Sequence, residues 1–138
     1  MLVAVLGLAP KAEAAEVKLY AGMHFWLQPN DILFDGGVMV GGALNDTVSL
    51  AFRGGVYINT EHNSLGIPID AVLRIDVRRS PIYFEAFGGP WIGLDGGQAF
   101  RAHVGGGFGA EFGAVSIGLE VAYLQPWSMI GPRFQLAF

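Results

Sequence analysis

The chain has 138 residues, of which 52% are hydrophobic and only 14% are charged, and its formal net charge is −4. A soluble domain usually carries about 25% charged residues, and binding to nucleic acid calls for a basic face, so neither class fits this composition. The sequence contains no cysteine, which excludes disulfides and thiolate metal sites. The length favours a single domain, and no motif predicts a cofactor, a metal site or catalytic residues.

The first residues differ from the rest of the chain. Residues 2–9 form a short apolar stretch, and Ala12, Glu13 and Ala14 have the small–x–small pattern of a cleavage site. This combination is typical of a secretory signal peptide, although the only nearby basic residue, Lys11, follows the apolar stretch. We therefore expect a signal peptide over residues 1–14, with a truncated start, and one domain over residues 15–138. The alternative is a short buried strand or helix.

From Val17 onward, apolar and polar residues alternate with period two, which is the pattern of a β-strand with two different faces. No apolar run after residue 16 approaches the roughly 20 residues that a membrane helix needs. The clearest alternation covers residues 65–77. The eight predicted strands cover residues 17–27, 38–44, 47–58, 65–77, 82–94, 100–112, 115–123 and 130–138.

The connections between these strands are alternately very short and longer. Short turns are predicted at residues 45–46, 78–80 and 113–114, and longer connections at 28–37, 59–64, 95–99 and 125–129. An even number of strands with this alternation is typical of an all-β, antiparallel, up-and-down transmembrane β-barrel. In such a barrel both termini are periplasmic and the longer loops lie outside the cell.

Every charge inside a predicted strand falls on the face opposite to the apolar row. A charge that faces lipid near the bilayer midplane costs about 2–4 kcal/mol, so the apolar row is predicted to face lipid and the charged row to face the interior. The inward cations are Lys18, Arg53, Arg74, Arg101 and Arg133, and the inward anions are Asp70, Asp76, Glu85, Glu111 and Glu120.

An eight-stranded barrel is only wide enough for side chains to fill its interior. Because an unpaired buried charge is costly, we expect these cations and anions to form an interior ion-pair network that leaves no wide water channel. The histidines His24 and His103 are expected to complete its hydrogen bonds. Three prolines, Pro68, Pro90 and Pro132, conflict with a closed ladder and are interpreted as bulges or strand ends.

The pattern of residues 15–138 resembles that of the small eight-stranded outer-membrane barrels of the OmpA/OmpX type. The most specific match is the C-terminal segment, where Phe134, Leu136 and Phe138 alternate and the chain ends on an aromatic residue. The resemblance implies an assembly signal read by the barrel-assembly machinery, and an integral protein of the bacterial outer membrane in contact with lipids and lipopolysaccharide. Leu136 stands where many members carry an aromatic residue, and the outer loops are too short for an adhesin.

Several residues of the predicted outer loops are candidates for contacts with other molecules. Ile32, Leu33, Phe34 and Trp127 are expected to be exposed apolar loop residues that could contact a protein partner or lipid headgroups. The loop acids could bridge divalent cations to lipopolysaccharide phosphates, although ordinary solvated charge is the simpler interpretation. These acids are Asp31, Asp35, Glu61 and Asp95.

The function predicted from these observations is a structural, interaction or envelope-integrity role without an open pore or chemistry of its own. Three alternatives stay open: an enzyme that modifies lipid A, a narrow channel, and a soluble exported barrel that binds an apolar ligand. The enzyme alternative depends on Ser116, His103 and Glu120, which are the residue types of a hydrolase triad but are predicted to point inward. The soluble barrel requires the opposite orientation, with apolar side chains inside.

Overall fold

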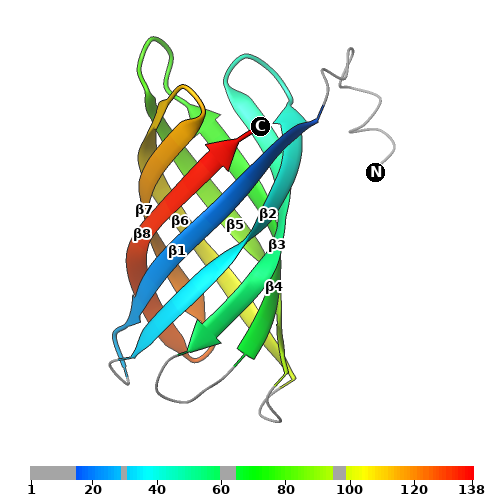
Figure 1. Cartoon of the computed structure of the whole chain (residues 1–138), viewed down its shortest axis with the longest axis vertical. Helices are drawn as coiled ribbons and strands as arrows, with labels where there is room; N and C mark the ends of the chain where they lie inside the picture. Colours follow the sequence, from blue (N-terminus) through cyan, green and yellow to red (C-terminus); the bar gives the residue numbers. More distant parts are fainter. Residues whose placement is uncertain (1–14, 29–30, 60–64, 95–98) are drawn as a thin grey trace.

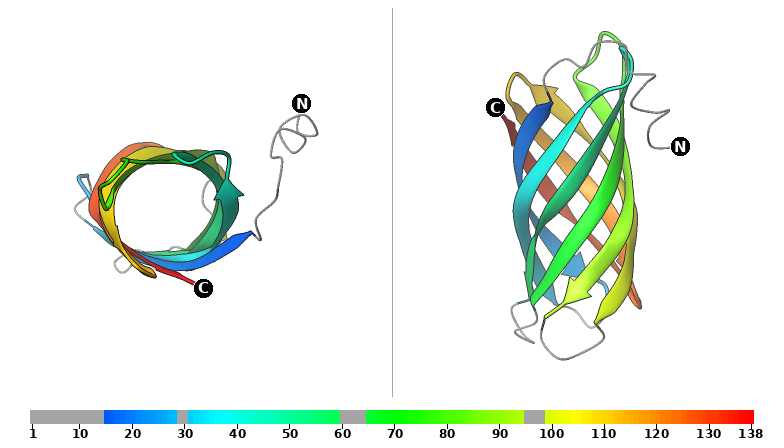
Figure 2. Two further views of the ribbon diagram at one scale, coloured as in Figure 1. Left: turned by 90° about the horizontal axis from the view of Figure 1, so that it is seen from above. Right: turned by 90° about the vertical axis from the view of Figure 1, so that its right-hand side faces the viewer.

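The computed structural model describes residues 15–28, 31–59, 65–94 and 99–138, which form one closed antiparallel barrel (Figure 1). Each strand pairs with the next along the chain, and β1 pairs with β8 to close the ring (Figure 2). None of the described residues belongs to a helix that could cross a membrane. The strands are β1 (Glu16–Trp26), β2 (Ile32–Ala43), β3 (Val48–Asn59), β4 (Leu65–Asp76), β5 (Ile82–Gly93), β6 (Phe100–Phe112), β7 (Val115–Leu124) and β8 (Trp127–Ala137).

The two ends of the barrel differ. The start of β1 and the end of β8 lie at one end, together with the short turns β2–β3, β4–β5 and β6–β7 (Figure 1). We call this the terminal end, and we call the opposite end, where the other four connections lie, the loop end. The prediction of eight strands in up-and-down order is confirmed. The predicted signal peptide over residues 1–14 lies outside the described residues.

The predicted two-sidedness of the strands is clear in β4. Asp70 and Arg74 are buried inside the barrel, whereas Ile69 and Leu73 are 47% and 40% exposed on the outer wall. The same alternation of buried and exposed positions runs through β1, β5 and β7. A soluble barrel with an apolar interior is therefore excluded, because the orientation is the reverse of the one it requires.

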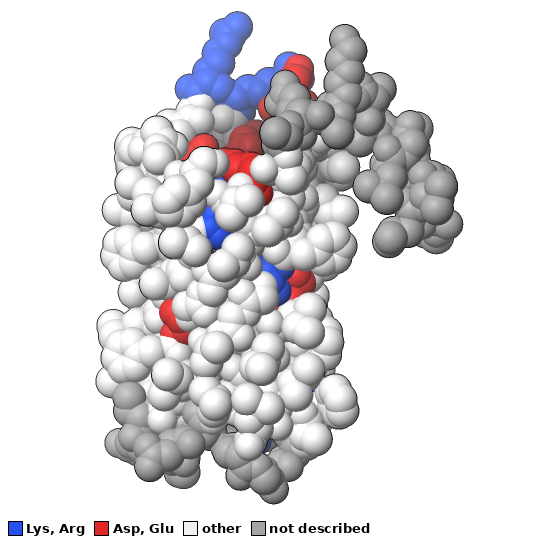
Figure 3. Space-filling view, turned by 45° about the vertical axis from the view of Figure 1, so that its right-hand side comes forward, with Lys and Arg blue, Asp and Glu red and all other residues white. Residues whose placement is uncertain are grey.

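The outer wall is a continuous apolar surface. Most of it carries no charge, and charged side chains gather mainly at the terminal end (Figure 3). Phe52, Val104, Phe108 and Phe134 are each more than half exposed on this wall. Apolar exposure on this scale is far beyond what a monomeric protein tolerates in water, whereas it is the expected outer surface of a barrel in lipid.

Two predicted strands are longer in the structure. β2 begins at Ile32 and not at residue 38, and β8 begins at Trp127 and not at residue 130. The added part of β2 alternates correctly, with Leu33 and Asp35 inside and Phe34 outside. The charge of Asp35 and the glycines that follow it suggested a loop. The connection between β7 and β8 is therefore only the two-residue turn Gln125–Pro126, not a longer loop.

The three prolines lie within strands, and the interpretation of them as bulges or strand ends is wrong. Each one faces an interruption in one of its two ladders. The β4–β5 ladder runs as far as the pair Pro68–Trp91 and resumes at the pair Ala71–Gly88, so Pro90 lies in the gap between them. The β3–β4 ladder is interrupted opposite Pro68, and the β1–β8 ladder opposite Pro132.

The register is the same on both sides of each of these gaps, so no residue is inserted. On the other side, each proline keeps its partner: Pro68 with Trp91, Pro90 with Ala102, and Pro132 with Leu119. A proline lacks only one donor, and the barrel tolerates its loss because the second ladder holds the strand in place.

Candidate functional site: an interior ion-pair network

The interior of the barrel holds a cluster of charged residues that we call the deep cluster: His24, Asp35, Arg53, Asp70, Glu120 and Arg133. Every one of these side chains is at most 3% exposed. They come from six strands, β1 to β4, β7 and β8, so the cluster ties most of the ring together. Alternate residues of every strand face the interior of a barrel, and each of these six residues occupies such a position.

Arg53 and Asp70 face each other directly across the β3–β4 ladder. The Arg53 Nη2 and Nε atoms both donate to Asp70 Oδ2, at 2.9 and 3.2 Å. Arg53 Nη1 donates to Glu120 Oε2 at 3.1 Å on the far side of the barrel. One guanidinium therefore joins β3, β4 and β7, and its planar shape suits such divided contacts.

Arg133 forms the second bridge of the deep cluster. Its Nη2 donates to Glu120 Oε1 and to Asp35 Oδ2, both at 2.8 Å, and its Nε lies 2.7 Å from Glu120 Oε2. His24 lies between the same two carboxylates, with Nδ1 3.2 Å from Asp35 and Nε2 3.3 Å from Glu120. When both ring nitrogens of His24 carry hydrogen, three cations face three anions in this cluster.

Aromatic rings fill the space between these ions. The Arg53 guanidinium carbon lies 4.3 Å from the centre of the Phe87 ring, and that of Arg133 lies 4.7 Å from the centre of the Tyr20 ring. His103 lies edge-on to Tyr57, and its Nδ1 is 2.9 Å from Asp70 Oδ1. Cation–π contacts of this kind gain strength where water is excluded. Together the rings and the ions fill the interior of the barrel at this level.

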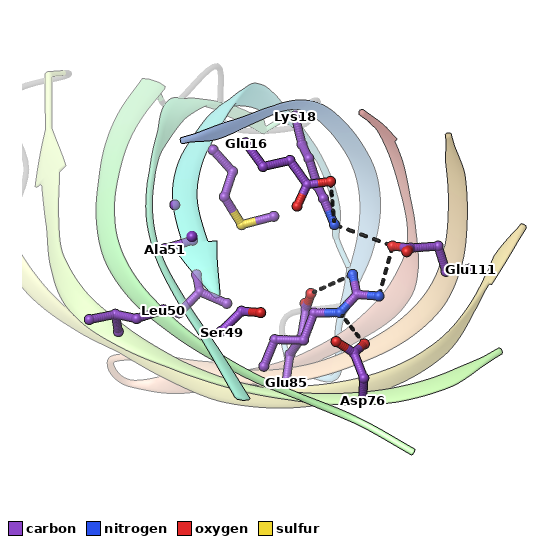
Figure 4. Close-up of a pocket in the computed structure, with 13 residues that line it drawn as sticks. Glu16, Lys18, Ser49, Leu50, Ala51, Asp76, Glu85 and Glu111 are labelled. Atoms are coloured by element: carbon purple, nitrogen blue, oxygen red, sulfur yellow. Dashed lines mark hydrogen bonds and ion pairs between the residues drawn. The ribbon is translucent and has the colours of Figure 1, made fainter. Parts of the chain in front are cut away.

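A second group of charges lines the mouth of the barrel at the terminal end, where the open space is about 470 Å³ (Figure 4). Arg74 faces Glu85 across the β4–β5 ladder, and its Nη2 donates to Glu111 Oε2 at 2.7 Å. Lys18 Nζ and Ser116 Oγ donate to the same oxygen of Glu111, at 3.3 and 3.1 Å. The remaining acids of the mouth are Glu16 and Asp76, which are half-exposed.

The loop end is closed by large uncharged side chains. Leu33, Leu124 and Met129 are at most 1% exposed, and the rings of Trp26 and Trp127 lie 5.3 Å apart. We call these five residues the apolar plug. The interior therefore has three levels from the loop end to the terminal end: the apolar plug, the deep cluster and the open polar mouth.

Nine of the ten predicted network residues take part in these two groups of ion pairs, and Arg101 does not. Within the described part of the chain Arg101 forms no ion pair; its guanidinium carbon lies 5.0 Å from the centre of the Trp91 ring, and it is half-buried near the loop end. The ion pair expected for Arg101 is thus not found among the residues that the structure describes. Its position as the second residue of β6 places it beyond the deep cluster.

Asp35 was expected to be a loop acid, and its place in the interior was not predicted. It is an inward residue of β2 and a partner of both Arg133 and His24. The signal that could have found it is its even spacing from the inward residue Met39, which extends the alternation backward. Asp31, also expected to be an exposed loop acid, is buried. Glu61 and Asp95 lie outside the described residues.

The four residues expected to be exposed in outer loops are strand residues, so that expectation is wrong. Leu33 is buried in the apolar plug, Trp127 is half-buried against Trp26, and Ile32 is half-buried at the start of β2. Phe34 is exposed, but on the apolar wall. These residues belong to β2 and β8, and neighbouring ones point to opposite faces of the barrel wall, so they cannot form one loop surface.

The C-terminal residues Phe134 and Leu136 are 51% and 42% exposed on the outer wall of β8, and Phe138 directly follows the strand. Ser116, His103 and Glu120 do not form a triad. Ser116 bonds Glu111, whereas His103 contacts Asp70 and Tyr57. Among the described residues, no group of histidines and acids has the geometry to hold a metal ion.

The row of glycines on β6 makes room for the interior side chains of the neighbouring strand. A Cβ atom on Gly105 would lie 2.5 Å from Phe87 Cζ and 2.5 Å from the carbonyl oxygen of Val121. Gly105, Gly107 and Gly109 stand directly opposite Phe87, Glu85 and Tyr83 of β5. The glycines therefore relieve crowding inside a narrow barrel, and the next element after β6 is the strand β7.

The fold is that of known transmembrane barrels. A structure reported as a de novo designed transmembrane β-barrel has a TM-score of 0.74 at 11% identity, covering 93% of this chain and 99% of that chain. The N-terminal β-barrel domain of Pseudomonas aeruginosa OprF gives 0.57 at 18% identity, covering 89% and 97%. The Yersinia pestis outer membrane protein Ail gives 0.57 at 11% identity, covering 91% and 100%.

The sequence matches no protein-family model and no curated protein. The structural likeness, together with the charged interior and the apolar wall, defines the class of the protein. The chain is a closed eight-stranded transmembrane β-barrel with the fold of the small OmpA/OmpX-type barrels.

Proposed function

We propose that this protein is a small integral barrel of the bacterial outer membrane, with periplasmic termini, that serves as a rigid structural or interaction element of the envelope and forms no open pore. The observation that carries the proposal is the position of the charges. Below the polar mouth, the deep cluster and its aromatic neighbours occupy the interior, while the outer wall is apolar. A filled interior does not suit transport, and an apolar wall suits permanent insertion.

The surroundings of the barrel follow from this proposal. Outer-membrane lipids and lipopolysaccharide are its immediate neighbours, and the barrel-assembly machinery is its partner during insertion, with Phe134, Leu136 and Phe138 as the signal. A protein partner would bind at the connections of the loop end. No catalytic role is proposed: the groups that could act as acid or base are engaged in ion pairs inside the barrel, away from the lipid that an enzyme of lipid A would have to reach.

Insertion is tested first by the migration of the detergent-extracted protein on gels. A closed membrane barrel is expected to migrate as a compact species before boiling and to shift after boiling. The cell fraction adds an independent measurement, because recovery from the aqueous periplasm without detergent would overturn the proposal. Mass spectrometry of lipid A should show the same acylation with and without the protein, whereas a change would indicate the lipid-modifying enzyme.

The absence of a pore is tested by recordings in planar bilayers. We expect no discrete conductance steps from the wild-type barrel. As a positive control, Arg53, Glu120 and Arg133 can be replaced together by alanine, which removes most of the volume of the deep cluster. Steps from the wild type of the same size as those from this variant would favour the narrow channel.

A further inference from the structure

The exposed positive charge of the barrel is concentrated in one turn at the terminal end. Of the basic side chains in the described part of the chain, Lys18, Arg53, Arg74 and Arg133 are buried inside and Arg101 is half-buried near the loop end. Arg78 and Arg79 are the exposed ones, and they lie together in the β4–β5 turn. Basic side chains stand clear of the rim at this end of the molecule (Figure 3).

Most acids of the same rim are directed elsewhere, and the exception is the exposed Asp46 of the β2–β3 turn. Glu16, Asp76 and Glu111 line the mouth of the barrel (Figure 4). Each of them forms an ion pair there with Lys18 or Arg74. Neither Arg78 nor Arg79 forms an ion pair with a described residue, and the β6–β7 turn at this end carries no charge. The rim therefore places Glu16, Asp76 and Glu111 toward the lumen and the two exposed arginines in the β4–β5 turn, and Asp46 is the one exposed acid of the described turns at this end.

The backbone of this turn gives a second, independent reason to consider the arginines functional. Arg79 has φ = 60°, and it is the one described residue other than glycine with a positive φ. The β6–β7 turn at the same end has Gly113 at φ = 62°. Glycine adopts this conformation without steric strain, because it has no Cβ atom. A long charged side chain at such a position is uncommon, and positions that break a local rule in this way are often functional.

The turn also lies at the correct height to meet lipid headgroups. Val77 and Ile82 flank the turn and are 39% and 44% exposed on the apolar wall. The Val77 N–H donates a hydrogen bond of 2.9 Å to the Ile82 carbonyl oxygen, which closes the turn. The arginines follow the last apolar residues of this wall. Basic side chains next to an anionic bilayer surface are stabilised by its negative charge.

We infer that Arg78 and Arg79 form a contact site for the headgroups of anionic glycerophospholipids in the leaflet that surrounds the terminal end. The inference rests on the proposed membrane insertion and adds the lipid class. The phosphate of such a headgroup accepts hydrogen bonds from the guanidinium groups, and its net negative charge is the feature that distinguishes it from a zwitterionic headgroup. The apolar residues Val77 and Ile82 contact the adjoining acyl chains.

The site can be tested on the folded barrel in zwitterionic micelles, with backbone amide NMR shifts as the readout and short-chain phosphatidylglycerol as the probe. We expect the shifts of residues 77–82 to respond to phosphatidylglycerol and not to phosphatidylcholine of the same chain length. Replacing both arginines by glutamine (R78Q with R79Q) should weaken the apparent affinity by about tenfold or more, since about 1 kcal/mol for each charge corresponds to roughly fivefold. Lysine at both positions should keep most of the affinity.

Arg79→Gly separates charge from backbone effects. It should weaken the response by about fivefold while leaving the barrel at least as resistant to unfolding as the wild type, because glycine accepts the positive φ without strain. Equal responses of the wild type and the double variant, or a response spread over both ends of the barrel, would overturn the site. If instead the protein shows no heat-modifiable form in zwitterionic lipid, insertion itself fails, and the two failures are thereby distinguished.

Discussion

Arg133 meets Glu120 through two nitrogens, with Nε 2.7 Å from Oε2 and Nη2 2.8 Å from Oε1, although they stand on different strands and diagonally across the β7–β8 ladder. The residues directly opposite them, Gly118 and Gly131, have no side chain. A Cβ atom at Gly118 would meet the Phe108 carbonyl oxygen and the Tyr83 hydroxyl, and one at Gly131 would meet the backbone of Met23, so neither position has room for a side chain.

Glu120 is the most consequential residue of the deep cluster, because Arg53, Arg133 and His24 all contact it. We expect Glu120→Gln to lower the free energy of unfolding by about 3–5 kcal/mol, the usual cost of leaving buried charges without their partner. Urea unfolding in lipid vesicles measures this. The matched control is Glu16→Gln at the exposed rim, where the loss should stay within about 1 kcal/mol. Equal effects of both changes would contradict a buried network.

The glycine row of β6 is predicted to be sensitive to added volume. Gly105→Val should destabilise the barrel by about 1–3 kcal/mol, since the new side chain would meet Phe87 and the backbone of Val121. Gly54→Val is the control, because a Cβ atom there has no neighbour within 4 Å and that position faces outward. Unfolding midpoints of the two variants in the same lipid give the comparison, and a neutral Gly105→Val would show that the interior is less filled than the structure indicates.

The depth of the barrel in the bilayer can be probed with a lipid-facing charge. Leu119 lies in the middle of β7, faces outward with 37% exposure, and pairs with Phe108 of β6 and Pro132 of β8. We expect Leu119→Arg to cost about 2–4 kcal/mol, whereas Val115→Arg, at the start of the same strand, should cost only about 0–1 kcal/mol. The free energy of unfolding in vesicles is the measurement. A larger cost at residue 115 would require a different position of the barrel along the membrane normal.

The apolar plug should keep water away from the loop end of the interior. In a variant whose other tryptophans are replaced by phenylalanine, the fluorescence of Trp26 should resist quenching by aqueous iodide, since Trp26 is 5% exposed. Leu33→Ala in the same background should increase the quenching, because it removes a neighbouring side chain of the plug. Strong quenching already in the parent variant would indicate a water-filled lumen.

Much of the architecture could be predicted from the sequence, because the period of a strand is two and a bilayer penalises charge on one face only. Asp70, Arg74, Glu85 and Glu120 could be assigned to the interior without any knowledge of their partners. Asp35 was harder to assign, because a single acid near glycines also fits a loop. Its even spacing from Met39 is the only sequence signal for β2, and the ion pair with Arg133 shows that it lies in the interior.

The sequence by itself determined which face of each strand meets lipid, since the alternation of apolar and charged residues is a local property. The tertiary structure alone decided which ions pair: Arg101 faces inward but lies beyond the deep cluster, whereas His24 joins two carboxylates from β2 and β7. The reason is that pairing depends on the stagger of the strands around the closed ring, and residues far apart in the chain reach the same height only after the barrel has closed.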